Sequence, residues 1–192
     1  MSELWDTYPR DFFVRPTLDV TRDLLGAVLC RRLDDGKVFS AAILEVEAYR
    51  QDDSACHAFR GLTERVKVMF GPPGFAYVYF IYGAYYCLNV VTEPEGVAGA
   101  ILLRAIEAPG GNGPGKLCRL LKIDKRQYGA DLCNPQSEVW IARAPRLDEL
   151  RVATSPRVGV TSASHLSWRF FVKDHKGVSV YRPYTKKRAV RS

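Results

Sequence analysis

The hydrophobic pattern of the first fifty residues predicts a short helix followed by two strands. Apolar residues recur at helical spacing over 16–25, after a Pro-Thr-Leu-Asp start that is typical of a capped helix, and Gly26 ends the pattern. Residues 27–33 are predicted to form a strand, and an Asp-Asp-Gly turn leads into a second strand over 37–49. The first elements are therefore expected to be a helix and a β-hairpin.

The middle of the chain is predicted to contain a loop, a short helix and a tyrosine-rich hairpin. Residues 50–61 are polar and without periodicity, so they are expected to form a loop. Thr63 is placed to cap a short helix that runs to residue 69, and a Gly-Pro-Pro-Gly break follows over 71–74. β-Branched and aromatic residues over 77–89 surround a Tyr-Gly step, which predicts a strand, a tight turn and a second strand.

The rest of the chain combines short strands, one helix and a loop rich in Gly and Pro. The predicted elements are a strand over 99–107, a loop over 108–115, a helix over 116–123, strands over 138–142, 157–160 and 169–172, and a frayed basic tail over 186–192. Hairpins outnumber possible βαβ crossovers, and no linker or internal repeat divides the sequence. We therefore expect a single α+β domain over 1–192, built on a mainly antiparallel curved sheet with surrounding helices and a protruding β-hairpin.

Length and composition fit one globular domain. The 192 residues are 47% hydrophobic and 26% charged, which is ordinary for a folded domain and argues against wholesale disorder. The apolar runs fall short of the roughly 20 residues that cross a bilayer, and the N-terminus lacks the layout of a signal peptide. The protein is therefore expected to be cytoplasmic, without a membrane partner.

The cysteines, the histidines and the net charge limit the kinds of site and partner that the protein can have. The five cysteines form no Cys-x-x-Cys pair and the three histidines are scattered, so neither a disulfide framework nor a metal centre is expected. Buried, reduced thiols are the expected state. The formal net charge of +7 favours a polyanionic partner such as nucleic acid, although a basic balance also occurs in proteins that bind none.

Two carboxylates on one strand are candidates for acid–base chemistry. Period-two geometry divides residues 43–49 into a polar and an apolar face: Glu45, Glu47 and Tyr49 against Leu44, Val46 and Ala48. Two carboxylates on one side of a central strand are costly unless they are solvated or paired. One interpretation is a strand face in contact with water. The other is that a desolvated carboxylate beside Tyr49 acts as a general base on water.

Arg104 interrupts an otherwise apolar strand. An arginine in such a run is expected to face a carboxylate or a phosphate, and Glu47 or Glu45 is a natural partner. The alternative is an edge-strand arginine whose side chain extends to water.

The tyrosine hairpin has two different faces. Alternation places Tyr77, Tyr79 and Ile81 on one face, and Val78, Phe80 and Tyr82 on the other. A bulky ring such as Tyr82 at the tip is suited to act as a wedge between base pairs, and Tyr79 could stack on a base removed from the helix. The alternative is a set of half-buried sheet tyrosines. Tyr77, Tyr85 and Tyr86 gain no role beyond the scaffold.

A Gly-rich motif before the second helix does not fit nucleotide binding. Residues 110–116 match G-x-x-x-x-G-K, but Leu117 stands where a P-loop needs Ser or Thr for magnesium, and Pro114 removes an amide from the cradle. A helix that begins near Lys116 still offers free amides and a cation to a single phosphate of a DNA backbone.

A series of short motifs occurs in order along most of the chain. They are Glu-Val-Glu-Ala-Tyr at 45–49, Cys-His at 56–57, Met-Phe at 69–70, Pro-Gly at 73–74, Tyr-Val-Tyr-Phe-Ile-Tyr-Gly at 77–83, Cys-Leu-Asn at 87–89, Leu-Leu-Arg-Ala at 102–105, Gly-Pro-Gly-Lys-Leu-Cys at 113–118 and Arg-Val-Gly-Val at 157–160. Together they resemble the alkyladenine (3-methylpurine) DNA glycosylases of base-excision repair. Several matches in register are more specific than any one of them.

The resemblance implies a monofunctional DNA glycosylase. Such an enzyme flips alkylated or deaminated purines (3-methyladenine, 7-methylguanine, hypoxanthine, ethenoadenine) out of duplex DNA and hydrolyses the N-glycosidic bond. It implies that Glu47 activates the attacking water and that Arg104 helps to position it, with no metal or organic cofactor. No lysine lies among the matched pocket positions, so hydrolysis without strand cleavage is expected. A monomer is the default expectation.

The resemblance also assigns the base-binding residues. Tyr49, His57 and Tyr79 would form the pocket that sandwiches the flipped base. Asn89 would line this pocket and disfavour the exocyclic amino group of guanine. Tyr82 would be the wedge that fills the gap left in the duplex.

Two other functions remain open on the sequence. A non-catalytic, structure-sensing DNA-binding module could use the same hairpin and basic surface, and it would bind DNA without base release. A hydrolase of free nucleosides could use Glu47, but it would leave Tyr82 unexplained.

Overall fold

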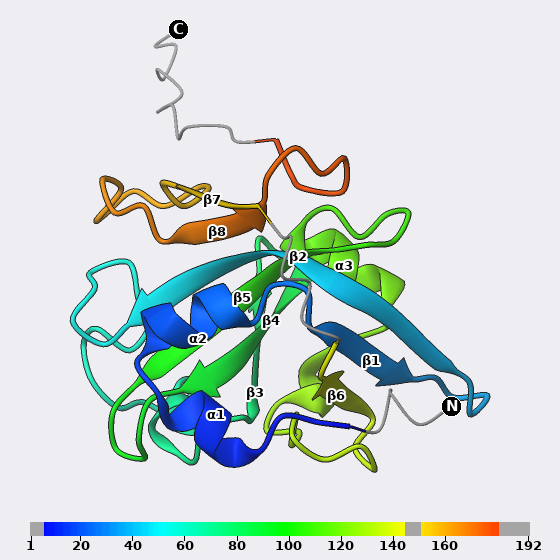
Figure 1. Cartoon of the computed structure of the whole chain (residues 1–192). Helices are drawn as coiled ribbons and strands as arrows, with labels where there is room; N and C mark the ends of the chain where they lie inside the picture. The colour runs from blue at the N-terminus through cyan, green and yellow to red at the C-terminus, as the bar shows by residue number, and fades with distance from the viewer. Residues whose placement is uncertain (1–5, 145–150, 181–192) are drawn as a thin grey trace, which may run out of the picture.

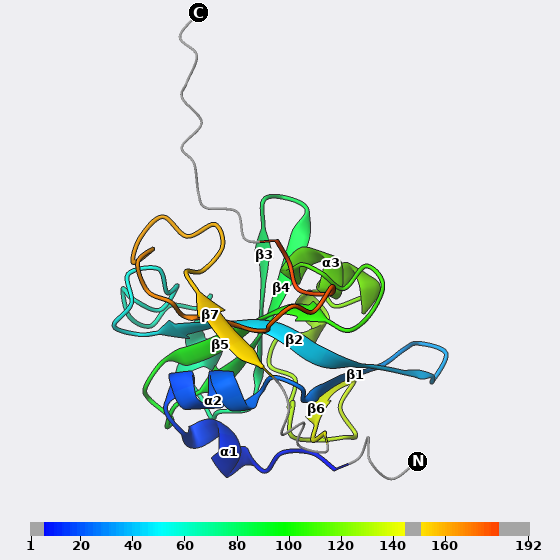
Figure 2. The ribbon, with the colours of Figure 1, turned by 45° about the horizontal axis from the view of Figure 1, so that its top comes forward.

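A computed structural model of the protein describes residues 6–144 and 151–180 (Figure 1). In this part of the chain, eight strands form one antiparallel sheet in the order β3-β4-β5-β2-β1-β6, with β8 paired to β2 and β7 paired to β8. The strands are β1 (Val28–Arg32), β2 (Val38–Arg50), β3 (Ala76–Ile81), β4 (Tyr85–Thr92), β5 (Gly99–Ile106), β6 (Val139–Ala142), β7 (Val152–Ser155) and β8 (Arg169–Val172). The expected α+β class with a curved antiparallel sheet is confirmed (Figure 2).

The 13-residue strand β2 connects the two parts of the sheet. Its first half pairs with β1, and its second half lies between β5 and β8 (Figure 1). The register with β5 shifts twice between Ile43 and Val46, an irregularity of the β-bulge type. The predicted apolar face is therefore wrong at one position. Ile43 joins Val46 in the main core, whereas Leu44 packs in a separate small cluster.

Short helices cover parts of the sheet. The helical elements in the described residues are α1 (Arg10–Val14), α2 (Thr17–Asp23), α3 (Pro114–Leu120) and the 3-10 turns η2 (Lys67–Phe70) and η3 (Lys125–Gln127). α2 packs on β2 and β5, and α3 packs on β4 and β5. The expected local cap of α2 is wrong, because Glu93 Oε1 accepts the Thr17 N–H at 2.7 Å from a distant part of the chain. Within residues 6–144 and 151–180, no helix has the length and apolar character needed to cross a bilayer.

Three predicted elements differ in the structure. The helix expected over 63–69 is only the 3-10 turn η2, without a side-chain cap. The helix expected from Lys116 begins at Pro114, because proline fits the first turn of a helix. The strand expected over 157–160 is a loop, since its Val158 N–H donates to the side chain of Glu47 rather than to a neighbouring strand. The basic tail 186–192 lies outside the described residues.

Candidate active site

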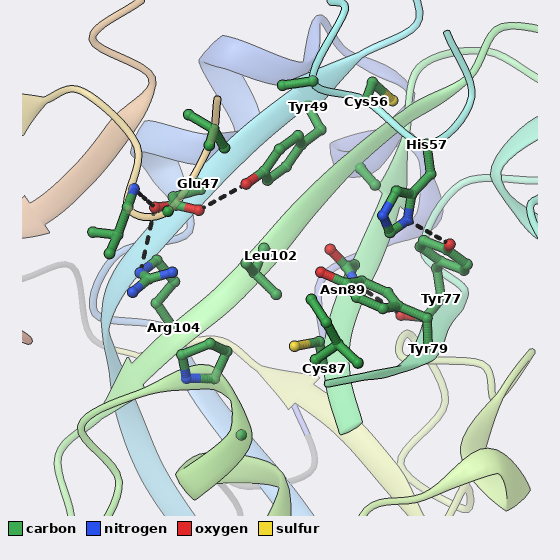
Figure 3. A pocket seen from close by; sticks show the side chains of 18 of the residues that line it. Glu47, Tyr49, Cys56, His57, Tyr77, Tyr79, Cys87, Asn89, Leu102 and Arg104 are labelled. Atoms are coloured by element: carbon green, nitrogen blue, oxygen red, sulfur yellow. Dashed lines mark hydrogen bonds and ion pairs between the residues drawn. The ribbon is translucent and has the colours of Figure 1, made fainter. Parts of the chain in front are cut away.

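Four neighbouring strands place a row of residues across one face of the sheet. The registers pair Glu47 with Leu102, Leu102 with Asn89, and Asn89 with Tyr77. Residues two positions along each strand project from the same face and extend this row: Tyr49, Arg104, Cys87 and Tyr79. Figure 3 shows the eight side chains around one cavity.

The cavity has a volume of about 680 Å³, which is within the range of small-molecule sites. The loop residues 54–57 and 158–162 and residues 113–116 at the start of α3 complete its wall. The structure brings to this cavity every residue with a predicted role in catalysis or DNA binding: Glu47, Tyr49, His57, Tyr79, Tyr82, Asn89, Arg104 and Lys116. The second candidate carboxylate, Glu45, does not line it. Their convergence satisfies a geometric requirement of the sequence hypothesis, while the role of each residue stays a prediction.

Glu47 is fully buried although it lines the cavity, so its carboxylate lies at the inner wall rather than at the mouth. Its Oε1 accepts a hydrogen bond from the Val158 N–H at 2.7 Å, and its Oε2 accepts one from the Tyr49 hydroxyl at 2.9 Å (Figure 3). An ionised carboxylate offers about four acceptor positions, so these two hydrogen bonds leave acceptor positions of Glu47 unused. The interpretation of a water-exposed strand face is wrong.

Arg104 is shared between two buried carboxylates. Its Nε donates to Glu45 Oε1 at 2.9 Å and lies 3.4 Å from Glu47 Oε1. Burial lowers the pKa of this guanidinium, but the charges of Glu47 and Glu45 outweigh burial and raise the pKa above its usual value. The residue is only 7% exposed, so the alternative of an arginine that extends to water is wrong.

Tyr49 is held between Glu47 and a second buried arginine. The guanidinium carbon of Arg157 lies 4.6 Å from the centroid of the Tyr49 ring and 5.3 Å from that of Trp168. Arg157 also forms an ion pair with Asp53, and both side chains are fully buried. Burial, and then the charge of Glu47, raise the pKa of Tyr49 well above its usual value. The hydroxyl therefore remains a hydrogen-bond donor at neutral pH.

Sequence reasoning missed the contribution of the 157–160 loop. Its arginine fixes the loop against Asp53, and the next amide binds Glu47. The available signal was the Arg-Val-Gly-Val motif among those on which the family resemblance rests, but its hydrophobic residues favoured a strand.

His57 lies beside two tyrosines on the other side of the cavity. Its Nδ1 is 2.9 Å from the Tyr77 hydroxyl, and its ring meets the Tyr79 ring edge-on with centroids 4.6 Å apart. The residue as a whole is exposed, but desolvation of its ring, with a smaller contribution from the charge of Arg65, lowers the pKa of His57 to about 4. His57 is therefore neutral at pH 7. Tyr77, expected only as scaffold, also lines the cavity and orients this ring.

Asn89 is fixed in the cavity wall. Its Nδ2 donates to the Tyr77 carbonyl at 2.9 Å, and the side chain is buried. A single orientation of the amide follows from this bond. Discrimination against the guanine amino group stays a prediction.

The turn between β3 and β4 holds Tyr82 in a conformation that bulky residues rarely adopt. Tyr82 has a φ of 55° and Gly83 a φ of 66°, and the Ala84 N–H donates to the Ile81 carbonyl at 3.3 Å. This is the pattern of a type I′ turn. The left-handed region costs a bulky residue about 1–3 kcal/mol. The side chain is 83% exposed, so a half-buried sheet tyrosine is the wrong description of Tyr82.

Lys116 lies at the exposed rim of the cavity. Its Nζ donates to Asn112 Oδ1 at 3.2 Å, within the first turn of α3 and the loop before it. A contact with a DNA phosphate stays a prediction.

The cavity also contains two thiols. Burial raises the pKa of Cys56 to about 11, and it raises the pKa of Cys87 above its usual value. Both are therefore thiols rather than nucleophilic thiolates at neutral pH. Among the residues that the structure describes, no group of three or more His, Cys, Asp or Glu could hold a metal ion. The arrangement offers a carboxylate base beside an aromatic wall.

Asp53→Ala should destabilise the protein by about 3–5 kcal/mol, because it leaves the buried Arg157 charge without a partner. Urea-induced unfolding measures the effect. The matched control is Asp52→Ala, whose exposed pair with Arg50 contributes only about 0–1 kcal/mol. Equally small losses in both variants would contradict the proposed importance of the buried pair.

His57 should titrate with a midpoint of about 4 in an NMR pH titration. Because this pKa lies below the roughly 6.5 of an unfolded chain, the unfolded state binds more protons between these values. The contribution of His57 to folding stability is then complete above pH 6.5 and is lost as the pH falls towards 4. A His57→Gln variant should lack this part of the pH dependence. A midpoint near 6.5 would show that the ring is solvated.

Comparisons with known proteins identify the family of this chain. A family model described as "Methylpurine-DNA glycosylase (MPG)" matches residues 11–176. A relative from Chlorobaculum parvum is 42% identical over 190 residues, which cover 90% of this chain and 90% of the relative. Another, from Methanocella arvoryzae, is 43% identical over 197 residues, with 91% and 96% covered. Both are named "Putative 3-methyladenine DNA glycosylase". Because the match extends over most of the sequence, this chain belongs to the methylpurine-DNA glycosylase family.

Proposed function

We propose that the protein is a monofunctional DNA glycosylase that removes alkylated or deaminated purines from duplex DNA, with Glu47 as the general base on water. The observation that carries the proposal is the position of the Glu47 carboxylate, buried at the inner wall of an aromatic cavity and held by Val158 and Tyr49. Family membership supports the class of reaction. The names of the relatives support 3-methyladenine as one substrate.

The proposed step is hydrolysis at the sugar carbon. The water oxygen forms a bond to C1′ and Glu47 accepts its proton. The C1′–N bond breaks, and its electron pair passes to the departing purine. The negative charge of Glu47 also favours an oxocarbenium-like transition state. An alkylated purine that carries positive charge becomes neutral as it leaves, so it needs little acid assistance.

The aromatic wall is suited to an extrahelical base. Enzymes that act on a base within duplex DNA swing the nucleotide into a pocket and stack the base between side chains. Tyr49, His57 and Tyr79 would supply these contacts, and each tyrosine face would attract a cationic base by about 0.5–2 kcal/mol. A neutral His57 avoids repelling such a base. Asn89 would disfavour the amino group of guanine.

The rim would contact the DNA itself. An exposed aromatic ring on a strained turn is suited to fill the gap that a flipped nucleotide leaves, so Tyr82 would act as the wedge. Lys116 would contact a backbone phosphate. It is exposed at the rim of the cavity. The proposed hydrolysis proceeds without a lysine intermediate and without strand cleavage.

Glu47→Gln should lower the release of hypoxanthine or 1,N6-ethenoadenine from a duplex oligonucleotide by about 10²–10⁴-fold, because an amide cannot take the proton of the attacking water. Release is measured as free base under single-turnover conditions, and alkali then reveals the abasic sites. The matched control is Glu64→Gln, which alters an exposed glutamate paired with Lys67 at 3.0 Å and should leave the rate unchanged.

The same assay separates the alternatives. Full activity of the Glu47→Gln variant would exclude Glu47 as the base. Duplex binding by the wild type without release of any alkylated or deaminated purine would favour a DNA-binding module instead. Trapping of a protein–DNA adduct by borohydride would contradict simple hydrolysis.

Tyr82→Ala should reduce base release from duplex DNA by roughly 5- to 150-fold, in line with the 1–3 kcal/mol of one aromatic–base stack. Release from a single strand should change little, because no gap between base pairs has to be filled there. Tyr82→Phe keeps the ring and should retain most of the duplex activity. The measurement is kcat/KM on both substrates, and an equal loss on the two would argue against a wedge.

A further inference from the structure

Glu45 is a fully buried carboxylate that the proposed reaction does not use directly. It is 0% exposed and does not line the cavity. Its oxygens accept four hydrogen bonds: from Arg104 Nε at 2.9 Å, Arg169 Nε at 2.6 Å, the Ser179 N–H at 2.8 Å and Ser179 Oγ at 2.8 Å. Burial raises the pKa of Glu45, but Arg104 and these bonds outweigh burial and lower it. Glu45 is therefore ionised at neutral pH.

The position of Arg104 shows what Glu45 does to its neighbour. Arg104 Nε carries one hydrogen, and this hydrogen is directed to Glu45 at 2.9 Å rather than to Glu47 at 3.4 Å. Glu47 receives its hydrogen bonds from Val158 and Tyr49 instead. A carboxylate that is fully paired with an arginine is a weaker base, because the positive charge favours its ionised form.

Arg169 completes a balanced group of four buried charges. It lies on β8, directly opposite Glu47 in the strand register, but its side chain is bonded to Glu45, to Ser155 Oγ at 2.9 Å and to the Ser179 carbonyl at 2.8 Å. Two arginines thus neutralise two glutamates, and Glu45 takes a hydrogen bond from both arginines.

We propose that Glu45 is a positioning residue of the hydrolytic site, which together with Arg169 keeps the Nε hydrogen of Arg104 directed to Glu45. Glu47 is left with only the longer 3.4 Å ion pair to Arg104 and is free to accept a proton from water. The inference rests on the proposed function of Glu47. Glu45 itself touches neither the cavity nor the reacting atoms.

Few other groups near Glu47 titrate in the acid range. Tyr49, Tyr79 and Cys87 have pKa values raised chiefly by burial and stay neutral there. Arg157 is paired with Asp53. His57 titrates at about 4 in the same cavity, but it is common to the wild type and to the variants below, so its effect cancels in a comparison.

The test is the pH dependence of single-turnover release of hypoxanthine by the full chain. The rate should fall towards low pH, and this fall is called the acid limb of the pH–rate profile. In Glu45→Gln, Arg104 turns to Glu47, so the acid limb should move to lower pH by about one unit or more. The rate at the plateau above this limb should fall about tenfold, because Glu47 is then a weaker base. In Arg169→Gln, the group of buried charges loses one positive charge and its carboxylates are less stabilised in the ionised form, so the acid limb should move to higher pH. Glu45→Asp keeps the charge and should restore the limb of the wild type. The dissociation constant for the lesion duplex should stay within twofold in all three variants.

A merely structural role of Glu45 and Arg169 would not move the acid limb to lower pH in Glu45→Gln and to higher pH in Arg169→Gln. A uniform loss of rate at every pH, or limbs that coincide with that of the wild type, would overturn the inference while the wild type remained active. Thermal unfolding checks the fold of each variant. If Glu45→Gln does not fold, the acid limbs of Arg169→Gln and Glu45→Asp are compared with that of the wild type instead. The inference then requires a shift to higher pH in the first variant and no shift in the second. No base release by the wild type would overturn the proposed function, and this inference with it.

Discussion

Two buried carboxylates on one strand set the constraint that the rest of the structure satisfies. An uncompensated ion in a protein interior costs several kcal/mol even after relaxation. Glu45 and Glu47 are tolerated because β5 brings Arg104 to one side of β2 and β8 brings Arg169 to the other. The sheet order around β2, and the irregular register near Glu45, are what this pairing requires. The charged group is thus a structural centre and, in the proposed reaction, also the origin of the base.

A second buried ion pair, between Arg157 and Asp53, positions residues of the cavity wall although neither of its members lines the cavity. Arg157 and Asp53 are 104 residues apart in the sequence, and their contact fixes the loop from which Val158 donates to Glu47. The same guanidinium lies over the Tyr49 ring, so one arginine orients both an aromatic wall residue and an amide that holds the carboxylate. The polar end of the cavity therefore depends on long-range contacts, whereas the aromatic side comes from the adjacent strands β3 and β4 and from the 54–57 loop.

This division explains what the sequence could predict. The pairing of Glu45 and Glu47 on one side of a strand follows from a local rule, period-two alternation, and an arginine within an apolar strand requires a partner wherever the strand lies. Both predictions held. The error at Leu44 and the mistaken strand at 157–160 have a different origin. A bulge depends on the register of the neighbouring strand, and a loop held by a remote aspartate looks like any short apolar segment. Tyr77 was underestimated for the same reason, since its partner His57 comes from a separate loop.

The depth of the cavity and the strain at its rim belong together. Glu47 is fully buried at the inner wall, so a sugar carbon within an undistorted duplex could not approach its carboxylate. Only a nucleotide rotated out of the helix would reach so far, and rotation leaves a gap between the flanking base pairs. The turn joins β3 to β4, but placing Tyr82 in it, at a φ of 55° that costs conformational energy, leaves the ring 83% exposed and contributes little packing to the folded domain. The conformational cost at Tyr82 is explained if its ring enters the gap that the rotated nucleotide leaves. In the proposed reaction the hairpin therefore opens the duplex, and the bond is broken at the far end of the cavity.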